Sequence, residues 1–74
     1  MTSDNCRRSL RAFAGRQPFK HFGIEFMTGF QLLIRHPEAV SYRGDVVIYT
    51  SPDGSQRLFD SASVCQLMDE AELG

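Results

Sequence analysis

Apolar residues near the start of the chain recur at the spacing of a helix. Positions i, i+4, i+7 and i+8 share one helix face, and here they hold Cys6, Leu10, Phe13 and Ala14. Ser3 or Asp4 can cap the first turn, because their side-chain oxygens can accept from free backbone N–H groups. Gly15 can end the helix in the left-handed conformation, and Pro18 prevents its continuation. The pattern predicts a helix over residues 4–14.

After residue 19 the apolar period changes from 3.6 to 2, which is typical of a strand with one buried face. This strand can pair with the following segment, residues 30–34, in either of two hairpin registers. A two-residue turn at Thr28-Gly29 would place Phe26 opposite Gln31 and Ile24 opposite Leu33, whereas a three-residue turn at 27–29 pairs apolar with apolar throughout. The second register pairs Phe26 with Phe30, Ile24 with Leu32, and Phe22 with Ile34. We expect this register, with Gly29 left-handed in the turn.

The stretch RHPE ends this hairpin. Pro37 cannot donate to a strand ladder and holds His36 extended, so we expect the chain to turn there. Alternating apolar residues on both sides of Gly44 predict a second hairpin, and SPDGS at residues 51–55 predicts a further turn.

The end of the chain predicts two more short strands. They lie near residues 56–60 and 64–68, and the SAS segment between them is short enough for one 3₁₀ turn. The acidic tail at 69–74 has no apolar stripe, so we expect it to fray.

These elements predict a mainly β single domain with one N-terminal helix. Residues 1–17 form the helix and a linker, 18–68 a small barrel of five or six short antiparallel strands, and 69–74 the tail. Closure is economical because it removes exposed strand edges. The longest apolar stretch is too interrupted to span a membrane and no secretory signal is recognisable, so we expect a cytoplasmic protein.

The order of elements resembles the SH3-like barrel, in particular its Sm-like variant. The stretches PFKHFGIEFMTG, HPEAV and PDG also resemble a group of short uncharacterised bacterial proteins with the pattern P-F-x-x-F-x-I followed by H-P-E. The resemblance covers roughly residues 18–68 and implies a fold without an activity. Sm-like proteins bind RNA as rings, but the loop signatures that contact RNA are absent here, so we assign no RNA-site residue from the resemblance.

Charge divides the chain unevenly. Residues 1–20 hold five basic residues and one acid, for a net charge of +4, while residues 21–74 hold three arginines and eight acids, for a net charge of −5. The candidate contacts for an anionic partner or a nucleic acid are Arg7, Arg8, Arg11, Arg16 and Lys20. We favour the interpretation of a solvated helix face, because no exposed aromatic residue is interleaved with the arginines to stack a base.

Candidate chemistry is sparse. His36 and Glu38 flank Pro37, and on an extended chain they stand nearly 7 Å apart, so a metal would need a third ligand. His21 and Glu25 have helical ligand spacing but fall in the predicted strand, about 13 Å apart. No nucleophile elbow or phosphate-binding loop is present. We therefore assign no catalytic, cofactor or metal site, and interpret the RHPE segment as a joint between strands.

Two cysteines, Cys6 and Cys65, match no metal-binding spacing, and the sequence leaves open whether they form a disulfide. The sequence favours a non-enzymatic interaction module that self-associates or docks a protein partner through a strand edge or the helix. The alternative is an RNA- or DNA-binding protein that uses the basic N-terminal helix. In a domain this small, oligomerisation is a common way to add to a limited core.

Overall fold

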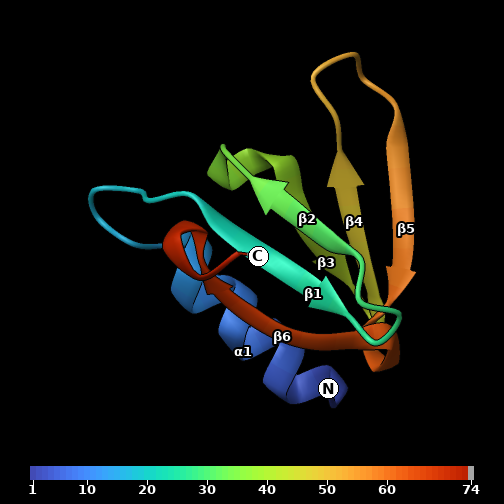
Figure 1. Cartoon of the computed structure of the whole chain (residues 1–74). Helices are drawn as coiled ribbons and strands as arrows, with labels where there is room; N and C mark the ends of the chain where they lie inside the picture. Colours follow the sequence, from blue (N-terminus) through green and yellow to red (C-terminus); the bar gives the residue numbers. More distant parts are fainter. Residues whose placement is uncertain (74) are drawn as a thin grey trace.

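A computed structural model describes residues 1–73 as one N-terminal helix and six antiparallel strands in two sheets (Figure 1). The helix α1 spans Ser3–Ala14. The strands are β1 (Phe22–Phe26), β2 (Gln31–Ile34), β3 (Val40–Arg43), β4 (Val46–Thr50), β5 (Gln56–Asp60) and β6 (Val64–Asp69). Three 3₁₀ turns complete the fold: η1 (Pro37–Ala39), η2 (Ser61–Ser63) and η3 (Glu70–Glu72). The mainly β class with one N-terminal helix is confirmed.

Helix α1 begins one residue earlier than expected. Its N-cap is Thr2, whose Oγ1 accepts from the Asn5 backbone N–H at 3.2 Å, so the prediction of Ser3 or Asp4 was wrong. Ser3 instead faces strand β3, where its carbonyl accepts from the Tyr42 hydroxyl at 3.0 Å. The apolar face is as predicted, with Cys6 and Leu10 buried.

Gly15 ends the helix by a different mechanism from the one we predicted. Its φ is −91°, outside the left-handed region. Its N–H donates to the Arg11 carbonyl at 3.0 Å, and a Cβ at this position would lie 2.8 Å from that same oxygen. Glycine is therefore required here by close approach to a backbone oxygen.

The β1–β2 hairpin has the predicted register. Phe22 pairs with Ile34 and Ile24 with Leu32, which places apolar side chains opposite one another. The Phe26 and Phe30 rings stack with centroids 5.8 Å apart, and Gly29 in the three-residue turn has a φ of 93°. The predicted turn conformation is also confirmed.

The segment between β2 and β3 is a joint, as predicted. His36 is extended, with φ −136° and ψ 137°, and Pro37 opens the 3₁₀ turn η1. Strands β3 and β4 form the second hairpin around Gly44, whose φ is 61°.

The 51–55 turn is held by side-chain hydrogen bonds to one carboxylate. Asp53 Oδ1 accepts from the Ser55 backbone N–H at 2.9 Å and from the hydroxyls of Ser51 and Ser55. The Ser51 hydroxyl contributes most, followed by the Ser55 N–H, and together these bonds lower the pKa of Asp53 to about 2.

This geometry predicts the pH dependence of the turn. Because the folded pKa lies below the unfolded value of about 3.9, the stabilisation is complete above pH 4 and is lost as the pH falls towards 2. An NMR titration of the Asp53 carboxyl carbon should show a midpoint near pH 2. In the Ser51→Ala variant the midpoint should rise towards 3.9, and an unchanged midpoint would contradict the assignment of the hydroxyl as the main cause.

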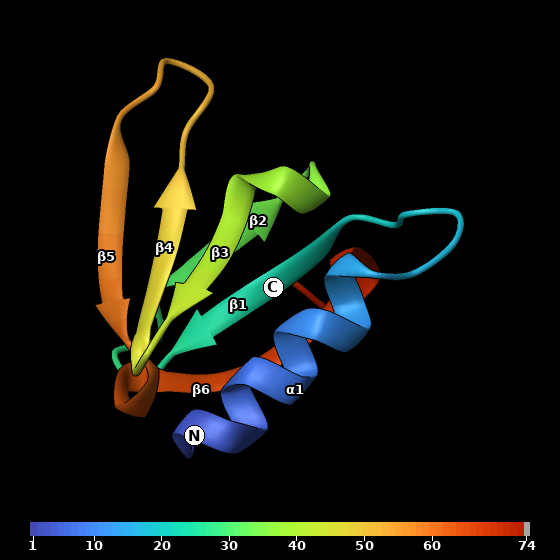
Figure 2. The ribbon, with the colours of Figure 1, turned by 180° about the vertical axis from the view of Figure 1, so that it is seen from behind.

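The two sheets have the orders β2-β1-β6 and β3-β4-β5. Figure 2 shows α1 lying alongside β6 and β1 on the side away from the viewer of Figure 1. The fully buried side chains between these layers are Phe22, Ile24, Ile34, Val47, Val64 and Cys6. Hydrogen bonding between strands does not join the two sheets into a closed barrel.

Residues 69–72, within the tail for which we expect fraying, belong to secondary-structure elements. Asp69 belongs to β6, and residues 70–72 form η3. The Leu73 side chain packs onto Gly23, where a Cβ would lie 2.2 Å from Leu73 Cδ2. A glycine in β1 thus leaves the space that the leucine fills, and this complementarity is not visible in the acidic composition. Residue 74 lies outside the described residues.

Within residues 1–73, no helix has the length and apolar character needed to cross a bilayer.

Candidate interaction site

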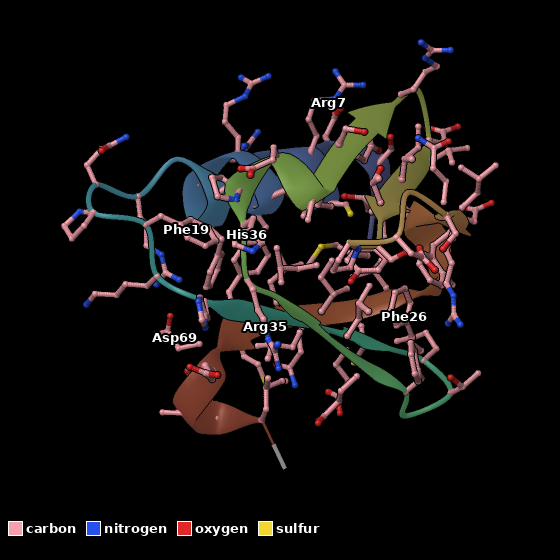
Figure 3. All side chains as sticks on the ribbon, turned by 90° about the horizontal axis from the view of Figure 1, so that it is seen from above. Arg7, Phe19, Phe26, Arg35, His36 and Asp69 are labelled. Carbon is pink, nitrogen blue, oxygen red and sulfur yellow. The ribbon has the colours of Figure 1, made fainter. Side chains whose placement is uncertain are left out.

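The structure separates the predicted basic residues into two groups. Arg7, Arg8 and Arg11 are exposed on α1, and we call them the basic helix face. Of the described residues, only Arg16 and His21 lie within ion-pair distance of a carboxylate, so the basic helix face has no acidic partner among residues 1–73. Figure 3 shows Arg7 and Asp69 on opposite sides of the molecule.

The side chain of Arg16 is held by contacts within the chain. Its guanidinium bonds Asp69 and donates to the Lys20 carbonyl at 3.1 Å, and it lies 4.7 Å from the centroid of the Phe13 ring. These contacts tie the segment after α1 to the end of β6. Arg16 is therefore not available to a partner in the way that Arg7, Arg8 and Arg11 are. Lys20 is exposed beside it, away from the basic helix face.

A shallow cavity of about 230 Å³ lies between α1 and β3. Its floor is apolar, and Arg7 and Arg11 line its rim. Arg7 stacks over the Tyr42 ring with its guanidinium carbon 5.0 Å from the centroid. The Tyr42 hydroxyl is already bonded to Ser3, whereas the side chains of Arg11 and Ser41 line the cavity and can offer polar groups to a ligand.

Three apolar side chains that the sequence did not single out as a site are exposed. Met27 is 69% exposed, Leu58 65% and Phe30 46%. Phe30 belongs to a groove of about 360 Å³, which we call the phenylalanine groove. It is lined by Phe26, Phe30, Phe59, Thr28, Arg57 and Ser63.

The neighbouring strand β5 is an edge of its sheet. It pairs with β4 on one side and has no strand partner on the other. In Figures 1 and 2 it lies at the outer margin of the molecule, with no element beyond it. We call this unpaired side of Gln56–Asp60 the β5 edge. An edge strand with a central exposed leucine is a template for strand addition.

Strand pairing explains why Leu58 is exposed. Phe59 lies opposite the fully buried Val47 and faces the core, so Leu58 must face the other way. The stretch QRLFD already indicates that one apolar residue is exposed, because adjacent residues of a strand face opposite sides and Leu58 and Phe59 therefore cannot both face the core.

The two histidine pairs do not gather further ligands. His36 and Glu38 are exposed on either side of Pro37. His21 lies 3.6 Å from Glu70, whereas Glu25 accepts from Gln66 at 2.8 Å and from Gln31 at 3.4 Å. In the described part of the chain, no three histidine, cysteine or acidic side chains are grouped so that they could share an ion.

Both cysteines are free. Cys6 is buried, and burial raises the pKa of its thiol, which disfavours the reactive thiolate. Cys65 is exposed on β6. The disulfide that the sequence left open is absent.

The chain matches no protein-family model, no curated protein and no solved structure.

Proposed function

We propose that this chain is a non-enzymatic interaction module that self-associates through the β5 edge. The observation that carries the proposal is Leu58, an apolar side chain left 65% exposed in the middle of an unpaired strand. Natural edge strands are commonly protected by a central charge, a proline or a covering loop. None of these protects the central position of β5 among the described residues.

Energetic considerations support the same proposal. Complete burial of a leucine side chain stabilises by about 1.5–3 kcal/mol. A domain of this size rarely gains more than about 3–5 kcal/mol from its own core, so burying Leu58 in two copies would add substantially. Exposed Phe30 lines the groove on the other face of β5, so the proposal rests on Leu58 alone.

We further propose that the fold is a small SH3-like barrel of the Sm-like variant. The support is the order of elements: an N-terminal helix, a run of short antiparallel strands, and a 3₁₀ turn before the last strand. Strand β6 pairs with β1, so the first and last strands are neighbours, as closure of a barrel requires.

The first test is the molar mass of the purified protein by sedimentation over a range of concentrations. We expect the mass to rise with concentration, and Leu58→Lys to give a monomer across the range because a lysine at this position disfavours pairing between two edges. The control is Ala12→Lys, which adds the same charge on the exposed part of α1. Folding of each variant is checked by circular dichroism. A wild-type mass that remains monomeric at the highest concentration would refute self-association.

A second candidate function is binding to single-stranded nucleic acid. The observation that favours it is that Arg7, Arg8 and Arg11 are exposed without an acidic partner. Anisotropy of a labelled single-stranded RNA, titrated at several salt concentrations, separates the two functions. Three phosphate contacts would give a log-log salt slope of about −2, while the interaction module predicts no salt-linked affinity.

A further inference from the structure

We infer that the partner of the β5 edge is the β5 edge of a second copy, paired antiparallel about a two-fold axis at Leu58. This inference rests on the proposed self-association and specifies its geometry. An isologous contact requires the same surface to be complementary to itself, and two-fold dimers are the commonest closed assemblies.

The two faces of β5 differ in chemistry. Arg57 and Phe59 lie opposite Tyr49 and Val47 of β4 and share the face that lines the phenylalanine groove. Leu58 lies opposite Ile48 on the other face, together with Gln56 and Asp60.

Antiparallel pairing about Leu58 is self-complementary at every position. The central Leu58 would meet its own copy, so that two exposed leucines cover one another. Arg57 would stand opposite Phe59, which pairs a guanidinium with an aromatic ring. Gln56 would stand opposite Asp60, which pairs an amide donor with a carboxylate acceptor. No two like charges face each other directly.

The polar groups needed for the pairing of Gln56 with Asp60 of the second copy are available. Asp60 Oδ1 accepts from the Ala62 backbone N–H at 2.9 Å, which leaves Oδ2 for a donor from the second copy. The Gln56 side-chain amide makes one long contact of 3.4 Å to Thr50 Oγ1 and can donate its second hydrogen.

The edges of β6 and β3 are less accessible. At the start of β6 the Val64 carbonyl accepts from the Met1 amino group at 2.7 Å. Figure 2 shows α1 running beside β6. Strand β3 contacts α1 through Tyr42 and Ser3. A second copy therefore meets less obstruction at the β5 edge than at the edges of β6 and β3.

The pairing makes a specific prediction for disulfide crosslinking. Residues directly opposite each other in an antiparallel pair have Cα atoms about 4.5–5.5 Å apart, which is within the range of a disulfide. Leu58 is opposite its own copy, whereas the two copies of Gln56 would be about 13 Å apart along the strands. We therefore compare Leu58→Cys with Gln56→Cys, each combined with Cys65→Ser to remove the exposed thiol.

The experiment uses diamide, which takes up the two hydrogens released when two thiols form a disulfide. Non-reducing electrophoresis follows the dimer with time. We expect Leu58→Cys to crosslink at least tenfold faster than Gln56→Cys, with circular dichroism confirming that both variants fold.

The outcomes separate this inference from the function on which it rests. Equal crosslinking rates in a protein that still associates by sedimentation would overturn the two-fold geometry and leave self-association intact. A Leu58→Cys chain that retains Cys65 and joins the introduced thiol to Cys65 would indicate head-to-tail pairing of β5 with β6, and would also overturn it. A strictly monomeric protein would remove both proposals.

Discussion

Replacing Phe22 by alanine is expected to leave most of the chain unfolded at 25 °C. Phe22 is fully buried in β1, and its ring contacts Phe13 of α1 at 5.3 Å and Phe19 at 6.2 Å between centroids. Truncating a buried phenylalanine to alanine costs about 3–5 kcal/mol. A core of this size supplies a total stability of about the same magnitude, so little remains.

The measurement is urea denaturation followed by circular dichroism at one fixed protein concentration. The matched control is Phe30→Ala, the same change at a ring that is 46% exposed, for which we expect a much smaller loss. If both variants lost equal stability, the position of Phe22 at the centre of the core would be contradicted.

Leu10→Ala is expected to have the next largest effect and to remove the helix. Helices of this length are marginal in water, so α1 persists because its apolar face is docked. Leu10 is 5% exposed, and truncation of a buried leucine costs about 2–5 kcal/mol.

The corresponding control is Arg8→Ala on the exposed side of the same helix. Alanine is the better helix former, so this variant should keep the helix and change the unfolding free energy by less than about 0.5 kcal/mol. Loss of helical circular dichroism in Leu10→Ala but not in Arg8→Ala would confirm that docking maintains the helix. Equal behaviour of the two variants would show that α1 is stable on its own.

Much of the fold could be predicted from the sequence, because local rules decide it. Alternating apolar residues and Gly29 fixed the register of the first hairpin, and Pro37 and Gly44 located the next two turns. The contact between Leu73 and Gly23 could not be predicted locally, because the two residues are far apart in sequence. Barrel closure also depends on how the two sheets meet, and no local pattern encodes that contact.

The candidate site was less accessible to sequence reasoning. The basic helix face is visible because Arg7, Arg8 and Arg11 are close in sequence, but the pairing that occupies Arg16 with Asp69 spans most of the chain. The β5 edge depends on the absence of a strand beside β5, and neighbours in a sheet are a property of topology. Leu58 was not singled out from the sequence, and the pairing of Phe59 with Val47 places it on the face opposite the core.

The pairing of β1 with β6 has a consequence for synthesis on the ribosome. The meander β3-β4-β5 joins neighbours in sequence and can form as soon as those residues emerge. Strand β1 is made early, yet its second neighbour is the last strand of the chain. We expect the buried side chains of β1 to stay uncovered until β6 is released, so a nascent chain halted after Asp60 should be a substrate for chaperones whereas the finished chain should not.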